Sequence, residues 1–280
     1  MRNRLALALM TAAGVAVVSA QSTTSGADPR RAVVDTSLAM MREGAWEPRA
    51  RGFYHLFDAE HPSGLHGATS RIPEWLGALL RNLPERADSV KGALVDLLAT
   101  ENVYRRGVAA PLSEEYGSYF GDLLAAVASI DDTRAAPALL ENIDRGALAM
   151  RGVARLGVDV SLDPLLALTR DRSELKRNAA LRTLALMLDT SINRTPITPA
   201  AQQKIDGAFV RGVQDENGFV RVSAVEGLGR IDGPHSTELL RSVAQSDPFR
   251  QVSETGEVSY PVREAARKAL AARRVPDVVQ

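Results

Sequence analysis

The sequence predicts an all-α fold, an α-solenoid in which about a dozen short helices form antiparallel pairs stacked in a row. Three observations support this prediction. Apolar residues recur at spacings of three and four, the period of an amphipathic helix. Alternating β-branched runs bounded by hairpin turns are missing, so no sheet is expected. A short residue pattern also recurs along the chain, as it does when each helix pair repeats one packing interface.

The first 20 residues have the pattern of an export signal. Arg2 and Arg4 precede an apolar run from Leu5 to Val18, and small residues follow up to Ala20. This run is shorter than the about 20 apolar residues that a membrane-spanning helix needs. We therefore expect cleavage after Ala20 and a periplasmic or extracellular protein without a membrane span. Loss of the two arginines leaves 32 of the 34 basic residues against 34 acidic ones, a formal net charge of −2.

The exported chain is expected to have three parts. Residues 21–30 form a polar leader, residues 31–132 a divergent, aromatic-rich helical part at the capping end, and residues 133–280 the repeats. Helix starts are indicated where Ser, Thr or Asp precedes Pro or an apolar run, because a side-chain oxygen can accept from free backbone N–H groups. The predicted starts are Thr133, Ser161, Thr198–Pro199 and Asp232–Gly233–Pro234.

The repeated pattern is clearest around Arg221. Val220 precedes this arginine, Ala224 and Leu228 follow three and seven residues later, and Asp215 lies six residues before it. Four other arginines share the frame, the last more loosely: Arg263 with Ala266, Leu270 and Glu257; Arg177 with Ala180, Leu184 and Asp171; Arg49 with Gly52, Leu56 and Glu43; and Arg151 with Ala154, Val158 and the displaced Asp144.

The frame predicts close packing between successive helices. Ala or Gly at the third place lets a neighbouring helix approach, and the Leu four residues later lies on the same face and fills the interface. The acid and the arginine can bond to those of adjacent units, which predicts a ladder along the stack. Its expected members are Asp171, Arg177, Asp215, Arg221, Glu257 and Arg263.

These residues resemble the HEAT repeat and its shorter relatives, the PBS-lyase-type HEAT-like repeats. In that family the second helix of each unit carries Val-Arg-x-x-Ala-x-x-x-Leu after an Asp, which the residues around Arg221 match best. The resemblance covers residues 133–273 well and residues 31–132 poorly, and inserts at 190–198 and 250–260 lengthen two units. It implies an α-solenoid whose inner helices form a concave surface that binds a partner.

Aromatic residues gather in the first half of the chain. Nine of the 13 lie between positions 46 and 120: Trp46, Phe53, Tyr54, Phe57, Trp75, Tyr104, Tyr116, Tyr119 and Phe120. They can line a groove for a peptide or glycan, or form a dense core at the capping end. We favour the core, because Phe53 and Phe57 are four residues apart on one helix face.

One segment carries candidate metal ligands. FDAEHPSGLHG places Asp58, Glu60, His61 and His66 within nine residues, and carboxylates and imidazoles are ligands for zinc. Histidine ligands on a rigid helix lie three or four residues apart, however, whereas these two are five apart across Pro62 and Gly64. We therefore favour a solvated loop, and an exported hydrolase or metal-binding protein is the alternative function.

Composition limits the other functions. The absence of cysteine excludes disulfides and thiolate metal sites, and equal numbers of basic and acidic residues give no net attraction to nucleic acid. No nucleophile elbow, phosphate loop or dinucleotide fingerprint occurs. We therefore expect a non-catalytic protein, without a cofactor, that binds another protein or a peptide. A rigid spacer in a larger envelope assembly needs the same stacked helices and is a further interpretation.

Overall fold

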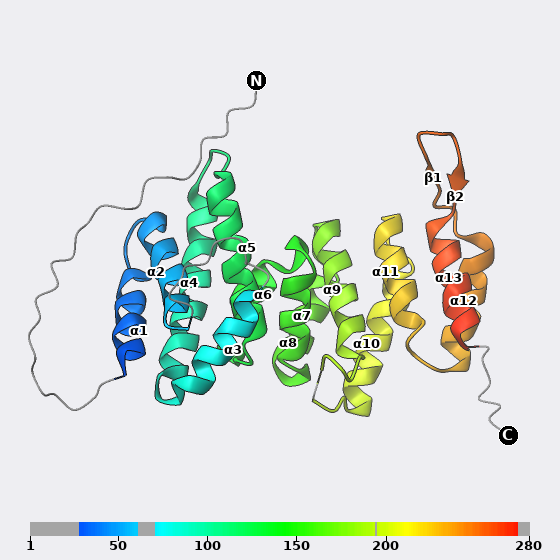
Figure 1. Ribbon diagram of the computed structural model, residues 1–280. Coiled ribbons are helices and arrows are strands. Elements are labelled where there is room, and N and C mark those ends of the chain that lie inside the picture. Colours follow the sequence, from blue (N-terminus) through cyan, green and yellow to red (C-terminus); the bar gives the residue numbers. More distant parts are fainter. Residues whose placement is uncertain (1–27, 61–70, 194, 274–280) are drawn as a thin grey trace, which may run out of the picture.

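The protein is almost entirely helical. The computed structural model describes residues 28–60, 71–193 and 195–273, and these contain thirteen α-helices, three short 3₁₀ turns and one small hairpin (Figure 1). The predicted all-α fold is therefore confirmed. The first 20 residues, with the expected export signal, lie outside the described residues. No helix in the described ranges combines the length and the apolar character needed to cross a membrane.

The helices pack as antiparallel pairs placed one after another. The first member of each pair is α1 (Pro29–Met40), α4 (Ala87–Gly107), α6 (Ala136–Glu141), α8 (Val158–Leu168), α10 (Pro199–Gly212) or α12 (Pro234–Ser246). The second member, in the same order, is α2 (Trp46–Asp58), α5 (Glu114–Ser129), α7 (Ala147–Arg155), α9 (Glu174–Met187), α11 (Gly218–Leu228) or α13 (Pro261–Arg273). The extra helix α3 (Ile72–Asn82) packs against α5.

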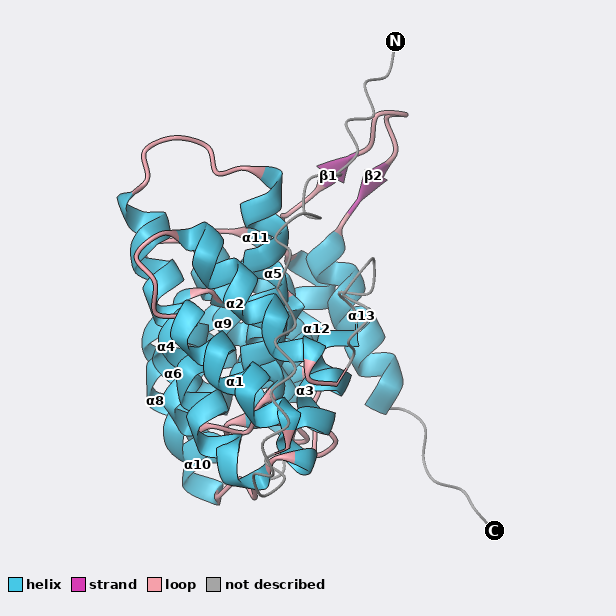
Figure 2. Ribbon diagram, turned by 60° about the vertical axis from the view of Figure 1, so that its left-hand side comes forward, coloured by secondary structure: helices cyan, strands magenta, loops and turns pink. Residues whose placement is uncertain are grey.

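Two rows of helices result from this pairing. The inner row consists of α5, α7, α9, α11 and α13, each of which packs against the next. The outer row begins with α4, α6, α8 and α10, and each outer helix also packs against its inner partner. Figures 1 and 2 show the chain progressing along the stack, with the hairpin projecting beside the start of α13. Contacts thus join neighbouring units.

The helix starts follow local capping chemistry. The prediction at Thr198–Pro199 is confirmed, because the Thr198 hydroxyl accepts from the N–H of Ala201 and Pro199 is the first helical residue. The prediction at Ser161 is wrong. Helix α8 begins at Val158, and Ser161 lies buried inside it, where its hydroxyl donates to the carbonyl of Val153.

The small and large residues of the repeated frame, at three and seven residues after the arginine, lie at buried contacts between helices. Ala180, Ala224 and Ala266 are fully buried, and so is Leu184. A Cβ added to Gly212 of α10 would lie only 2.8 Å from the Cβ of Ala224. The small side chain therefore sets how closely these helices approach.

The frame proposed around Arg151 is wrong. Helix α7 ends at Arg155, so Ala154 and Val158 belong to different helices. The fully buried residues Ala149 and Val153 occupy the small and large places instead. Counting back from them puts Gly146 at the place that arginine fills in other units, which leaves Arg151 exposed on the inner row.

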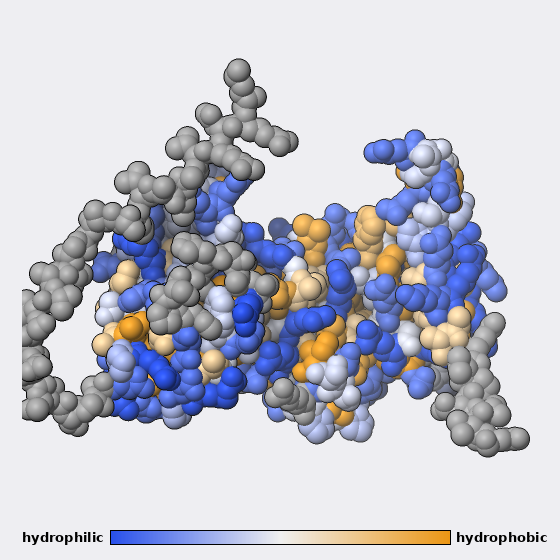
Figure 3. All heavy atoms as spheres, in the orientation of Figure 1, coloured by the Kyte–Doolittle hydropathy of each residue, from blue (hydrophilic) through white to orange (hydrophobic). Residues whose placement is uncertain are grey.

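The insert at 250–260 contains the small hairpin. Strands β1 (Gln251–Val252) and β2 (Val258–Ser259) pair antiparallel, so the sequence prediction of no sheet missed this element. Apolar side chains are exposed on the hairpin and in the first turns of α9 and α11, where Leu175 and Phe219 lie. Figure 3 shows apolar atoms at the upper edge of the molecule over these two helices.

The aromatic residues of the first half form a core, as favoured from the sequence. Phe53, Phe57, Tyr116 and Tyr119 are all buried. Phe53 packs edge-on against Phe57 at 5.3 Å between ring centres and against Tyr119 at 5.8 Å. These rings join α2 to α5 across the 55 residues that separate the two helices in the sequence.

Candidate functional site

An arginine at the start of α9 links two consecutive units. The Nε of Arg177 donates to Asp215 Oδ2 at 2.8 Å and its Nη2 donates to Oδ1 at 2.9 Å. Its Nη1 donates to the carbonyl of Asp171 at 3.0 Å. Burial opposes the charge of Asp215, but the hydrogen bonds from Arg177 and the N–H of Asn217 outweigh it, so the pKa of this carboxyl lies below its ordinary value.

The same geometry recurs one unit later. The Nε of Arg221 donates to Asp247 Oδ2 at 2.8 Å, and its Nη2 donates to Oδ1 at 3.1 Å. Its Nη1 donates to the carbonyl of Asp215 at 2.8 Å. Each arginine therefore bonds to the backbone of its own unit and to the carboxylate of the next one. We call Arg177, Asp215, Arg221 and Asp247 the ladder.

Two residues predicted for the ladder, Glu257 and Asp171, do not bond to a frame arginine through their side chains. Asp247, and not Glu257, takes the acidic place before α13, and the Nε of Arg263 donates to the carbonyl of Asp247 at 2.5 Å. Glu257 lies in the hairpin, where its backbone bonds to Ser253. The carboxylate of Asp171 accepts from the N–H of Ser173. Among the described residues no arginine bonds to this carboxylate, and Gly146 takes the place of the frame arginine before the preceding inner helix.

A related ion pair lies in the aromatic core. The Nε of Arg49 donates to Glu101 Oε1 at 2.7 Å, and both side chains are buried. Tyr116 and Tyr119 donate their hydroxyls to the same carboxylate at 2.9 and 3.1 Å. Burial and the neighbouring Glu101 charge raise the pKa of both tyrosines well above the ordinary value. This network is fully enclosed and serves packing.

The predicted metal ligands are only partly described. His61 and His66 lie outside the described residues. Asp58 accepts from the ring nitrogen of His55 at 2.8 Å, and Glu60 accepts from the amide of Asn82 at 2.8 Å. Neither carboxylate approaches another possible ligand to form a group of three among the residues that the structure describes.

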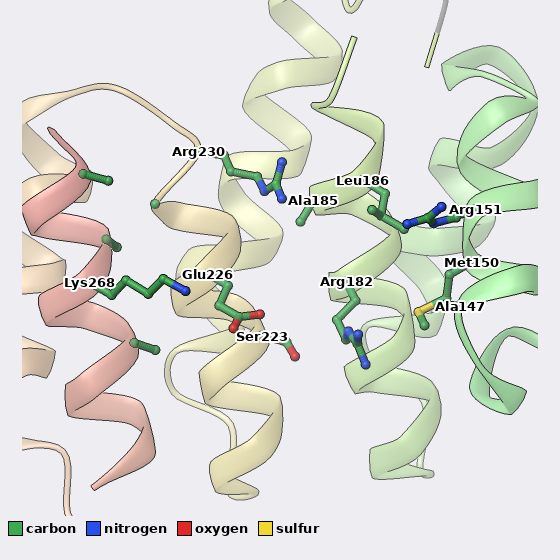
Figure 4. A pocket seen from close by; sticks show the side chains of 14 residues that line it. Ala147, Met150, Arg151, Arg182, Ala185, Leu186, Ser223, Glu226, Arg230 and Lys268 are labelled. Atoms are coloured by element: carbon green, nitrogen blue, oxygen red, sulfur yellow. The ribbon is translucent and has the colours of Figure 1, made fainter. Parts of the chain in front are cut away.

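An open hollow runs across the inner row. It has a volume of about 530 Å³, within the usual range of ligand pockets. We call it the groove. Four successive helices, α7, α9, α11 and α13, supply its lining: Ala147, Met150, Arg151, Arg182, Ala185, Leu186, Ser223, Glu226, Gly229, Arg230, Ala265, Lys268, Ala269 and Ala272 (Figure 4).

The groove combines a small-residue floor with a charged rim. Alanines, Gly229, Met150 and Leu186 keep the floor shallow and apolar. Above it, Arg151, Arg182, Glu226 and Lys268 are exposed. Figure 4 shows Lys268 extending from α13 toward Glu226 of α11, while Arg182 points into the hollow from α9. Such a surface suits a ligand that has both apolar and charged groups.

A second hollow continues the same face toward α5. Its volume is about 430 Å³, and Arg151 lines both hollows. Its other lining residues are Pro73, Ala125, Ala128, Ser129, Leu148, Arg155, Ser191 and Ile192. The two hollows together therefore extend over five inner helices, from α5 to α13, an elongated shape that suits an extended chain better than a compact small molecule.

Sequence reasoning missed the groove residues although their signal was present. Arg182, Glu226 and Lys268 each follow the frame arginine of their helix by five residues, and Arg151 follows Gly146 by five. The repeated frame predicted only the buried positions of each helix, whereas the position five residues after the arginine faces outward. Once the frame of α7 is corrected, the row of charges can be read directly from the sequence.

The comparisons with known proteins identify no relative. No protein-family model matches the sequence, and no curated protein matches it.

Proposed function

We propose that this chain is an exported, non-catalytic α-solenoid of HEAT-like repeats that binds a segment of another protein in its groove. The observation that carries the proposal is the groove itself, which crosses four consecutive inner helices and presents apolar floor and charged rim together. Extended peptides bind surfaces of this kind through side chains placed at regular intervals.

The ladder supports this role by fixing the positions of the inner helices. Arg177 and Arg221 each anchor two units to one another through paired hydrogen bonds. A bidentate arginine–carboxylate pair restrains orientation as well as distance. The rim residues are thereby held at regular intervals, so that a bound segment meets a preorganised surface and loses less free energy on binding.

Selection from a random peptide library, with the chain from residue 21 onward as bait, tests the proposal. Ala272 lies exposed at the groove edge, so Ala272→Trp should obstruct the groove. Ala167 is exposed on the outer helix α8, so Ala167→Trp is the matched control. We expect enriched peptides to bind the parent and Ala167→Trp and to lose binding to Ala272→Trp. Equal binding to all three proteins, or no enrichment at all, would contradict the proposal.

A further inference from the structure

The charged rim of the groove indicates what kind of segment it accepts. We infer that the groove selects an extended acidic segment whose carboxylates are spaced about three residues apart. This inference rests on the proposed function and adds the chemistry of the ligand.

The rim charges occupy one repeated place. Arg151 on α7, Arg182 on α9, Glu226 on α11 and Lys268 on α13 are equivalent in the corrected frame. Because adjacent inner helices pack in the same register, equivalent residues line up across the stack. Three of the four are cations, and the turn that follows α11 adds Arg230.

Three of the four rim cations form no ion pair among the described residues. In the described part of the chain, Arg151, Arg182 and Lys268 form no hydrogen bond or ion pair, and Arg230 reaches Asp189 only at 4.0 Å. This differs from the ladder, where each arginine bonds to the aspartate of the next unit and to backbone carbonyls. The four cations face two carboxylates, Glu226 in the lining and Asp189 beside Arg230, so the rim keeps an excess of positive charge although the whole chain is formally neutral.

Helix geometry sets the spacing of the complementary charges. Neighbouring helix axes lie about 9 Å apart, so four inner helices span about 27 Å. An extended chain advances about 3.3 Å per residue, so one helix spacing corresponds to about three residues. A segment of about ten residues with a carboxylate at every third position therefore matches the rim.

Glu226 is the one rim position whose charge opposes an acidic segment. It interrupts the row of cations and faces Lys268 across the groove (Figure 4). An acidic segment is repelled at this place, so Glu226→Gln should strengthen its binding by about two- to fivefold. Arg182→Gln and Lys268→Gln should each weaken it by a similar factor. A purely structural role of these exposed side chains predicts no change of either sign.

The test uses fluorescence anisotropy with three peptides of about ten residues. They share Leu, Gly and Ser at the intervening positions and carry Glu, Gln or Lys at every third position. We expect the Glu peptide to bind at least about tenfold more tightly than the other two, and added salt to weaken it. Arg241→Gln is the matched control, because Arg241 is exposed on the outer helix α12 and lies outside the groove.

The outcomes separate the two claims. Equal or tighter binding of the Gln or Lys peptide overturns the acidic inference, as does weakening by Arg241→Gln as strong as that by Arg182→Gln. If library peptides bind through the groove but the Glu peptide does not, the inference fails and the proposed function stands. If neither the library nor the three probes yields groove-dependent binding, both fail.

Discussion

Arg177 and Asp215 form a bidentate ion pair that joins the start of α9 to the segment before α11. Their two hydrogen bonds are 2.8 and 2.9 Å long, and both side chains are largely buried. Because Arg221 repeats the arrangement with Asp247, the pairs act as spacers that set the register of consecutive inner helices. The groove rim depends on this register.

Loss of the Arg177 side chain should destabilise the fold, and its effect should not add to that of losing Asp215. Arg177→Met leaves the Asp215 carboxylate without its main partner, so the free energy of unfolding should fall by about 1–3 kcal/mol. Arg177→Met combined with Asp215→Leu should lose less than the two single changes added together. Urea unfolding of the four proteins measures this coupling. Additive losses would mean that the pair contributes no net interaction.

The ladder also predicts a pH dependence. The folded pKa of Asp215 is lowered, so its contribution to stability is complete above the unfolded value of about 3.9 and is lost as the pH falls through the folded pKa. The stability difference between the parent and Asp215→Asn should therefore be constant above about pH 5 and shrink below pH 4. Chemical unfolding at a series of pH values tests this. A difference that grows on acidification would contradict the assigned direction.

Overpacking the helix contact at Ala224 should be costly. Ala224 is fully buried and faces the Cα of Gly212 on α10, so Ala224→Leu should lower the free energy of unfolding by about 1–3 kcal/mol. Ala167→Leu, at an exposed place of α8, is the control and should change it by less than about 0.5 kcal/mol. Equal urea midpoints for the two variants would show that the contact is not close-packed.

The buried carboxylate of Glu101 should be essential to the aromatic core. Glu101→Leu leaves Arg49 charged and buried without its carboxylate, so stability should fall by about 3–5 kcal/mol. Arg49→Met in the same protein should recover part of that loss, because no buried charge then remains unpaired. Thermal unfolding of the single and double variants compares them. A double variant less stable than Glu101→Leu would contradict this account.

Much of the architecture could be predicted from the sequence, because close helix packing imposes a local pattern. The small residues Ala180 and Ala224 and their arginines recur at fixed spacings within one helix. The frame predicted around Arg151 was wrong because the α7 unit has Gly146 where the other units have an arginine, so the nearest arginine did not mark the repeated position. Asp247 was missed because the hairpin insert separates it from Arg263, which placed Glu257 at the expected spacing instead.

The candidate site was harder to predict for a physical reason. Arg151, Arg182 and Lys268 lie on three different helices, and their grouping depends on how these helices are stacked. The sequence places each of them on an exposed face, but a charge on an exposed face is the common case for any helix. Only the alignment of equivalent places across the row distinguishes the rim from ordinary solvated charge.

Site-specific photocrosslinking tests the central claim, that the groove is the binding surface, most directly. A photoreactive residue at position 272 lies at the groove edge, and the same residue at position 167 lies on the outer helix α8. In envelope extract we expect a discrete adduct from position 272 only, and its loss when the Glu peptide is added in excess. Equal adducts from both positions, or an adduct at 272 that the Glu, Gln and Lys peptides all leave unchanged, would contradict the account.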